Sequence, residues 1–311
     1  MKALELTKDY WNAVAEPELE AAFPKLFPRL AVGLAGNGSE CFGYDDEQSM
    51  DHDWGVDFFI RVPENERGNI SALQTWKEDL FSRRPPQHVR KQSELGGMVG
   101  VMTTGDFYRS LIGSPAAPAD VLEWRRAPEE NYAMAVNGEV FRDGAGEFTS
   151  IRNSLLAYYP EDLRKKKIAA RCMALAQTGQ YNFERVARRE DWVTVRTVLA
   201  KFTQEAMGLA YHLNRVYRPY YKWTWRKLKE LPVMGGGLAE MLRELACMGS
   251  MDRESRILQQ KIIDRICSMF AEELRRQKLS DSQDWFLAEH GTAVQRTIRH
   301  ELLRSLPPQY E

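Results

Sequence analysis

The apolar positions of this chain follow two different patterns, and the change between them falls near residue 115. In the first part, short apolar runs alternate with helical segments, which is typical of a mixed α/β lobe. Residues 30–35 and 56–60 predict buried strands, and residues 97–103 predict a third strand. Residues 3–26 and 70–81 predict helices.

Beyond residue 115 the apolar residues recur every three or four positions, which is the period of an amphipathic helix. Residues 163–188 predict one helix, and the four-residue turn that follows it is short enough for the next helix to pack antiparallel. That next helix is predicted by the stripe Val195, Leu199, Phe202, Ala206, Leu209, Leu213 and Val216, and Pro219 should end it.

A further amphipathic helix is predicted over residues 253–277, and the last thirty residues should also be helical. The stripe of this helix contains Leu258, Ile262, Ile266, Phe270 and Leu274. We therefore expect an α+β protein with a small mixed-sheet domain over residues 1–115 and an all-helical bundle over residues 116–311. A length of 311 residues is consistent with two domains.

Composition places the chain among ordinary globular proteins, with 28% charged and 43% hydrophobic residues. No apolar run approaches the roughly 20 residues of a membrane span, so we expect no membrane partner. The four cysteines are far apart in sequence, which indicates reduced thiols. These features, and an N-terminus without a signal-peptide core, predict a cytoplasmic location.

The net charge of −1 conceals an uneven distribution. Residues 1–60 contain 12 acidic and 4 basic side chains, whereas residues 161–230 contain 16 basic and 7 acidic ones. This asymmetry predicts one region that holds a metal ion and another that attracts an anion, and a nucleoside triphosphate satisfies both. The alternative is that solvated, charged helix faces happen to cluster.

The candidate chemistry begins at a turn, Gly36-Asn-Gly38-Ser39, which directly follows the first predicted strand. About a dozen residues later, Asp51 and Asp53 stand at the start of the second predicted strand. Residues two apart on a strand point to the same face, so these carboxylates should share a cation, and we expect Mg²⁺. The alternative is a glycine turn followed by a solvated, acidic strand end.

A second candidate cluster lies in the helical half. Gln177, Tyr181 and Arg185 are four residues apart and should share one helix face, while Asn182 falls in register with the apolar stripe. Residues 214–223 then concentrate cations and aromatic rings, including Lys222. Such a segment can stack a base and bind phosphates, or it can be an aromatic helix end packed against a neighbour.

The pairing of a Gly-Ser turn with a later Asp-x-Asp strand resembles the nucleotidyltransferase fold of the DNA polymerase β superfamily. The resemblance implies that Gly38 and Ser39 cradle the terminal phosphates of a nucleotide. It also implies that Asp51 and Asp53 are the catalytic metal ligands. The cofactor would be Mg²⁺, with ATP as co-substrate.

Longer stretches resemble an uncharacterised bacterial family that joins a minimal nucleotidyltransferase domain to a helical domain of unknown function. They include the Asp-His-Asp-Trp-Gly segment, residues 140–146, 158–162 and 177–185, and Pro-Tyr-Tyr-Lys-Trp at 219–223. The helical half is similar to the HEPN-like second domain of kanamycin nucleotidyltransferase. This resemblance implies that Lys222 reaches the triphosphate, and that Gln177, Asn182 and Arg185 line the nucleotide cleft.

The sequence departs from the superfamily at the third carboxylate, which a neighbouring strand normally supplies. The predicted third strand contains no acidic residue, and Asp57 lies about 13 Å along the strand from Asp53. Glu94, Asp106 and Asp143 are the other candidates for the missing carboxylate. The departure weakens the expectation of catalysis more than the expectation of nucleotide binding.

Two functions therefore remain open. The first is a Mg²⁺-dependent nucleotidyltransferase that moves a nucleoside monophosphate, AMP from ATP, to a hydroxyl of a small molecule or a protein. The alternative is a non-catalytic protein that keeps the fold and binds a nucleotide or a partner. A nucleic-acid acceptor is less favoured, because the overall charge is near zero and no long basic stretch is present.

Overall fold

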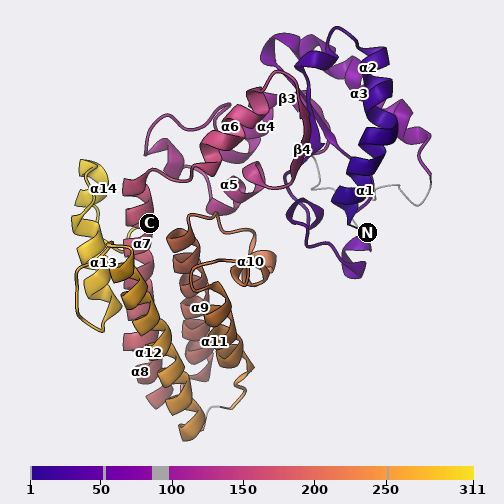
Figure 1. Cartoon of the computed structure of the whole chain (residues 1–311). Helices are drawn as coiled ribbons and strands as arrows, with labels where there is room; N and C mark the ends of the chain where they lie inside the picture. The colour runs from indigo at the N-terminus through magenta and orange to yellow at the C-terminus, as the bar shows by residue number, and fades with distance from the viewer. Residues whose placement is uncertain (1, 52–53, 86–97, 251) are drawn as a thin grey trace. The chain divides into compact units, whose positions relative to one another are not determined.

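The structure is a computed structural model that describes residues 2–51, 54–85, 98–250 and 252–311 (Figure 1). It divides into two compact units, Met1–Tyr158 and Tyr159–Glu311. The first unit contains a four-stranded mixed sheet with helices, and the second is helical over the residues that are described. The predicted α+β class is therefore confirmed.

The elements of the first unit are α1 (Ala3–Tyr10), a π-helix (Trp11–Ala15), α2 (Glu16–Ala22), β1 (Ala31–Leu34), η3 (Glu40–Phe42), η4 (Glu47–Asp51), β2 (Phe59–Val62), α3 (Ile70–Ser82), β3 (Val101–Thr103), α4 (Thr104–Ile112), α5 (Glu129–Val136), β4 (Glu139–Asp143) and α6 (Glu147–Leu156). Short 3₁₀ turns, η2, η5 and η7, occupy Phe27–Arg29, Glu64–Asn69 and Glu123–Arg125.

The strand order is β3-β2-β1-β4, with β1 antiparallel to both of its neighbours and β2 parallel to β3. The first predicted strand is confirmed by β1, all of whose residues are buried. The second begins at Phe59 and not at Val56, and the third is shortened to Val101–Thr103. The sequence pattern missed β4, which pairs with β1 and so places residues 116–158 in the first unit, beyond the expected boundary at residue 115.

Alternate residues of β2 face two different layers of helices (Figure 1). Phe58, Ile60 and Val62 belong to one core cluster with residues of the α1–α2 segment and α3, including Trp11 and Leu73. Figure 1 places α4 and α6 on the other side of the sheet. There Phe59 packs against Phe107 and Phe148, with ring centroids 6.3 and 5.0 Å away. The strand period of two therefore separates the two cores.

Arg61 is fully buried on the second of these faces. Its guanidinium lies 4.6 Å from the ring centroid of Phe59 and 4.7 Å from that of Phe107. It donates to the carbonyl of Gly100 at 2.6 Å and to the carbonyl of Met98. Burial lowers the pKa of Arg61 to about 9. The side chain therefore holds the segment that leads into β3 against β2.

A buried ion pair joins α3 to the residues before β2. Lys77 Nζ lies 2.7 Å from Asp57 Oδ1, and both side chains are at most 10% exposed. Lys77 also donates to the carbonyl of Val99, and Asp57 accepts from the Phe58 N–H at 2.8 Å. Burial lowers the pKa of Lys77, and the Asp57 charge opposes that shift.

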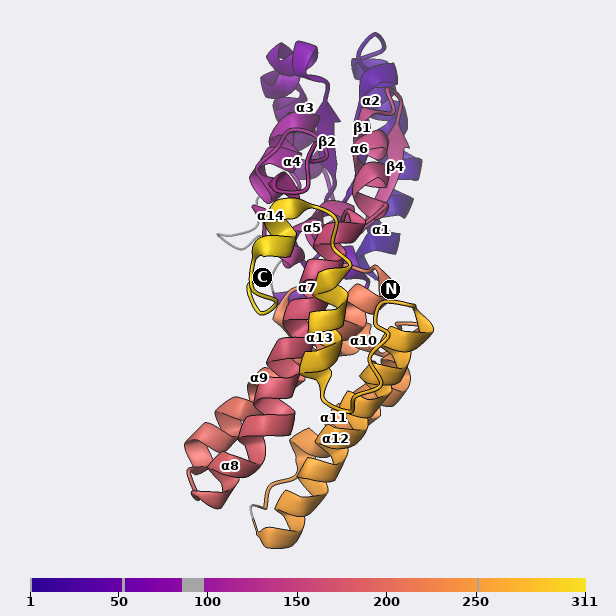
Figure 2. The ribbon, with the colours of Figure 1, turned by 90° about the vertical axis from the view of Figure 1, so that its left-hand side faces the viewer.

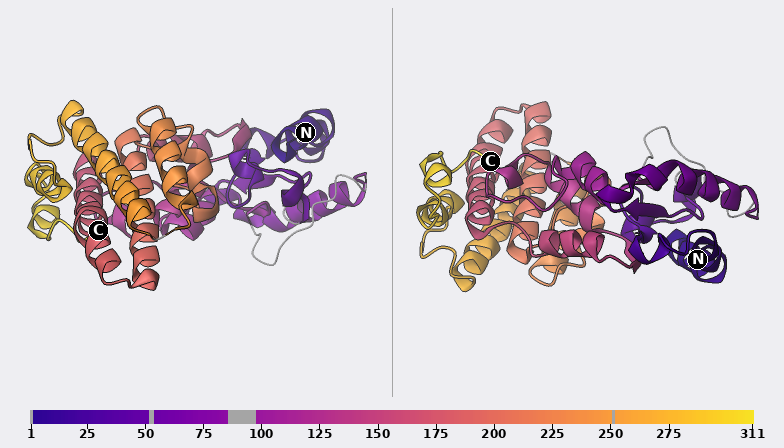
Figure 3. Two further views of the ribbon diagram at one scale, coloured as in Figure 1. Left: turned by 90° about the horizontal axis from the view of Figure 1, so that it is seen from below. Right: turned by 90° about the horizontal axis from the view of Figure 1, so that it is seen from above.

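The elements of the second unit are α7 (Glu161–Leu175), the π-helix η8 (Ala176–Asn182), α8 (Phe183–Arg188), α9 (Trp192–Asn214), α10 (Tyr221–Leu228), α11 (Gly235–Cys247), α12 (Arg253–Arg276), α13 (Leu287–Arg296) and α14 (Glu301–Ser305). Helix α13, coloured yellow, packs along α7 on the outside of the bundle (Figures 2 and 3).

The apolar stripe predicted for the long helix is confirmed, because its residues from Val195 to Leu213 are buried in the bundle core. The helix ends at Asn214, five residues before Pro219, because Arg215 takes a left-handed conformation with φ of 54°. The predicted helix over 163–188 is interrupted by η8. Gly179 in η8 packs so closely that a Cβ would lie 2.5 Å from the Phe202 ring.

Two expectations for the rest of the bundle were wrong or incomplete. Leu258, predicted to belong to the buried stripe of α12, is 45% exposed. The apolar pattern also missed α10 and α11, and α11 begins with three consecutive glycines, which disfavour helix. Within the described residues, each helix is too short or too polar to cross a bilayer.

The buried pair gives a stability prediction. Lys77→Met should leave the Asp57 carboxylate buried without its cation and lower the free energy of unfolding by about 3–5 kcal/mol. The double variant Asp57→Asn/Lys77→Met should recover most of that loss in a urea titration. Arg83→Met is the control, since Arg83 and Glu18 form an exposed pair, and should cost at most about 1 kcal/mol. An unchanged urea midpoint for Lys77→Met would contradict the prediction.

Candidate functional site: a glycine turn after β1

The turn predicted from the sequence directly follows β1, which lies between β2 and β4 in the sheet. Gly36 and Gly38 have φ angles of 118° and 114°, a backbone conformation that residues with a Cβ rarely adopt. Gly38 has a second constraint, because a Cβ there would clash with the carboxylate of Glu40. Glu40 itself is buried at the start of η3. Both glycines are therefore required by the geometry of the turn.

The side chain of Asn137 fixes the first residue of this turn. Its Oδ1 accepts the Gly36 N–H at 2.8 Å, and its Nδ2 donates to the Gly36 carbonyl at 2.7 Å. The amide thus satisfies both backbone groups of a buried glycine, as a neighbouring strand would. Asn137 was not among the residues selected from the sequence, since a lone Asn-Gly pair indicates only a turn.

The segment that carries Asn137 is itself held in place. The Gly138 N–H donates to the Cys41 carbonyl at 2.8 Å, and a Cβ at Gly138 would clash with the Leu34 carbonyl. Arg152 on α6 donates to the carbonyls of Val136 and Gly138 at 2.8 and 3.1 Å. Helix α6 is therefore connected to the glycine turn by two successive sets of hydrogen bonds, from Arg152 to residues 136–138 and from Asn137 to Gly36.

Met98 also packs against Gly36. A Cβ at Gly36 would lie 2.6 Å from the Met98 sulfur, and the Met98 carbonyl accepts from the buried Arg61. The position of Gly36 is therefore defined by two segments from distant parts of the sequence, one carrying Asn137 and the other Met98.

The loop after the turn is anchored by Asp45, which is buried. Its Oδ2 accepts the Ala3 N–H at 2.9 Å and the Trp54 Nε1–H at 3.0 Å. Ser39, the second residue of the predicted phosphate turn, is partly exposed, and its carbonyl accepts the Tyr44 N–H at 2.9 Å. Asp45 therefore has a structural role that ties α1 to this loop.

The two predicted metal ligands fall at the limit of what the structure describes. The sequence pattern predicts Asp51 at the start of the second strand. In the structure Asp51 is instead the last residue of η4, and β2 begins at Phe59. Asp53 lies outside the described residues, as does the environment of the Asp51 side chain. The expectation that both carboxylates share a metal stays a prediction.

Three of the candidates for a third carboxylate already have partners. Asp57 pairs with Lys77, Asp106 pairs with Arg67 at 2.7 Å and Arg109 at 2.6 Å, and Asp143 accepts backbone N–H groups. Glu94 lies outside the described residues. The described part of the chain contains no cluster of three or more His, Cys, Asp or Glu side chains that could hold a metal ion.

The residues expected to bind nucleotide from the helical unit do not form one group. Arg185 belongs to α8, which precedes α9, whereas Lys222 belongs to α10, which follows it. Helix α9 has 23 residues and so spans about 33 Å. Lys222 is exposed, with its Nζ 5.0 Å from the Trp223 ring centroid. Asn182 is partly exposed at the end of η8, where the π-turn shifts the helical register and buries Phe183.

Gln177 and Tyr181, in contrast, line a common pocket of the helical unit. Arg185 lies over the Tyr181 ring, 3.9 Å from its centroid, but is not among the residues that line this pocket. The predicted sharing of a face is thus seen for Gln177 and Tyr181.

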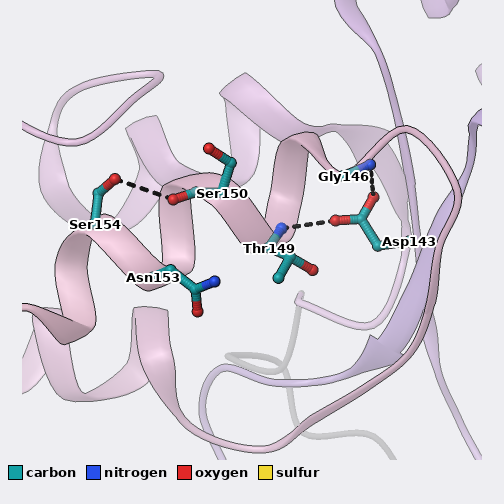
Figure 4. A pocket seen from close by; sticks show the side chains of 6 residues that line it. All are labelled: Asp143, Gly146, Thr149, Ser150, Asn153 and Ser154. Atoms are coloured by element: carbon teal, nitrogen blue, oxygen red, sulfur yellow. Dashed lines mark hydrogen bonds between the residues drawn. The ribbon is translucent and has the colours of Figure 1, made fainter.

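A separate open depression lies beside α6 in the first unit (Figure 4). Its lining includes Ser150, Asn153 and Ser154, which present polar groups. The Asp143 carboxylate at its edge accepts the N–H groups of Gly146 at 3.0 Å and Thr149 at 2.7 Å. Asp143 therefore caps the start of α6.

Comparison with known proteins gives one match. Residues 124–224 match a family model described as a domain of unknown function (DUF4037). The matched range includes Asn137, Arg152, η8 and Lys222. No curated protein and no solved structure matches the chain.

Asn137→Ala should loosen the glycine turn, because Gly36 would lose partners for two buried backbone groups. Unsatisfied buried groups cost about 1–3 kcal/mol each. Hydrogen–deuterium exchange over residues 36–44 should therefore accelerate. Asn153→Ala, at an exposed asparagine of α6, is the matched control and should leave that exchange unchanged. Equal exchange rates in both variants would contradict the assigned role of Asn137.

Proposed function

We propose that this protein is a Mg²⁺-dependent nucleotidyltransferase that transfers a nucleoside monophosphate, AMP from ATP, to a hydroxyl group of a small molecule or a protein. The observation that carries the proposal is the turn from Gly36 to Ser39. It follows an inner strand of a mixed sheet, and its two glycines have positive φ.

Gly38 and Ser39 are assigned to the phosphates of the nucleotide. A turn of this kind can direct successive backbone N–H groups toward an anion. The two hydrogen bonds between Asn137 and the Gly36 backbone favour such a role, because a preorganised turn does not have to be ordered when the ligand binds.

Asp51 and Asp53 are assigned as the residues that hold the metal. When bound there, Mg²⁺ would supply electrostatic stabilisation of the charge on the reacting phosphate. In the transfer, the acceptor oxygen forms a bond to the α-phosphorus, the α–β phosphoanhydride bond breaks and pyrophosphate leaves. The proton of the acceptor hydroxyl passes to a base or to water. The role of Lys222 as a phosphate contact stays a prediction.

A second candidate function is a nucleotide-binding or partner-binding protein without transferase activity. The observation that favours it is the engagement of Asp57, Asp106 and Asp143 by other partners. Without a third carboxylate the site lacks an evident general base.

The double variant Asp51→Asn/Asp53→Asn tests the assignment of the metal ligands. It should abolish ATP-dependent labelling of acceptors while the circular dichroism spectrum and the thermal midpoint stay the same. Glu47→Gln, at an exposed acid of the same loop, is the control and should retain labelling. Undiminished transfer by the double variant would remove the proposed mechanism.

The two candidate functions differ in turnover. Calorimetry with ATP and Mg²⁺ measures binding, and pyrophosphate release over a panel of hydroxyl acceptors measures transfer. We expect both signals from the wild-type protein. Binding without pyrophosphate release on every acceptor would favour the non-catalytic function.

A further inference from the structure

The helical unit contains a pocket of about 660 Å³, which is within the size range of small-molecule sites. Residues of α7, η8, α9 and the C-terminal segment surround it. The lining is Ala170, Arg171, Met173, Ala174, Ala176, Gln177, Tyr181, Lys201, Glu205, Phe286, Ala288 and residues 309–311. Three of these residues, Ala176, Gln177 and Tyr181, come from η8, and π-helical turns occur frequently at functional sites.

Two polar anchors hold the walls of this pocket in place. The Gln180 side chain accepts the Leu287 N–H and donates to the Trp285 carbonyl, both at 2.9 Å, which fixes Phe286 beside η8. Lys166 is fully buried, and its ammonium donates to the Pro307 carbonyl at 2.6 Å. The C-terminal segment therefore packs on the bundle, where Figure 2 shows it beside α7.

The charges of the lining are nearly all neutralised. Arg171 pairs with Glu205 at 2.9 Å, and Glu311 pairs with Lys167 at 3.0 Å. Lys201 is exposed on α9, one turn before Glu205. It supplies the remaining positive charge of the lining, as far as the chain is described.

Aromatic rings provide the other part of the chemistry. Tyr181 and Tyr310 are 48% and 56% exposed, and Phe286 is partly buried. The Arg185 guanidinium lies over one face of the Tyr181 ring, and Arg185 is not part of the pocket lining. Gln177 adds an exposed amide, which both donates and accepts hydrogen bonds.

We infer that this pocket binds a planar heteroaromatic ring that carries an anionic group, the chemistry of a mononucleotide. The ring stacks on Tyr181, the Gln177 amide recognises its polar edge, and Lys201 contacts the anionic group. The site goes beyond the proposed transferase function, because its lining contains none of Gly38, Ser39, Asp51 or Asp53, and of the residues that the resemblance assigns to the nucleotide cleft it contains Gln177 but not Asn182, Arg185 or Lys222. Both acidic side chains of the lining, Glu205 and Glu311, are paired with cations, so the binding proposed here uses no metal.

The test is calorimetric titration of the full chain carrying Asp51→Asn/Asp53→Asn, in EDTA, with AMP, GMP, CMP, UMP and adenosine. At least one mononucleotide should bind. Adding Tyr181→Ala should weaken that binding about tenfold or more, the effect of losing one stacked ring. Lys201→Ala should weaken the mononucleotide but not its nucleoside, shown for AMP against adenosine. Lys261→Ala, at an exposed lysine of α12, is the control and should change neither.

Two results would overturn the inference. One is the absence of binding for all four mononucleotides at millimolar concentration. The other is binding that is unaffected by both Tyr181→Ala and Lys201→Ala. Because these measurements use the variant that lacks both aspartates, they are independent of whether labelling of acceptors succeeds or fails.

Discussion

The pairing of one side-chain amide with one backbone glycine is the contact on which the first unit depends most. Gly36 lies two residues after the inner strand β1, and the Asn137 amide pairs with its backbone as a neighbouring strand would. Arg152 holds the segment that carries Asn137, and Arg61 holds the segment whose Met98 side chain packs against Gly36. Arg61 and Arg152 thus donate to backbone carbonyls near the turn that we assign to the phosphates. Because both guanidinium groups are engaged by these carbonyls, we assign the phosphate contacts to backbone N–H groups of the turn.

Local patterns in the sequence predicted the α+β class, the first strand, the helix over residues 70–81 and the stripe of α9. Each of these elements is encoded by the spacing of apolar residues within one short, continuous stretch of sequence. The strand β4 could not be predicted in the same way, since its residues are only partly buried and its position depends on pairing with β1. For the same reason the sequence suggested Gly38 and Ser39 but not Asn137, whose role arises from a contact across 101 residues.

In the helical unit, sequence spacing correctly grouped Gln177 with Tyr181, and Arg185 contacts the Tyr181 ring but does not line the pocket that the other two share. Spacing by four assumes a uniform α-helix, and η8 changes the register at that point. The same π-turn brings Gly179 into contact with the core and leaves Tyr181 at the surface. The separation of Lys222 from Arg185 along α9 could not be deduced from composition, because a cluster of cations in sequence says little about distances in a bundle.

The long separation between Gly36 and Asn137 also bears on how the chain acquires its structure during synthesis. When only the first 115 residues have emerged from the ribosome, β1, β2 and β3 are available for pairing, but Asn137 and β4 are not. The inner strand β1 would then be an open edge, and such edges pair readily with other chains. The first unit can close only after about 143 residues have emerged, so a fragment cut at the apparent boundary in the sequence would be prone to aggregate.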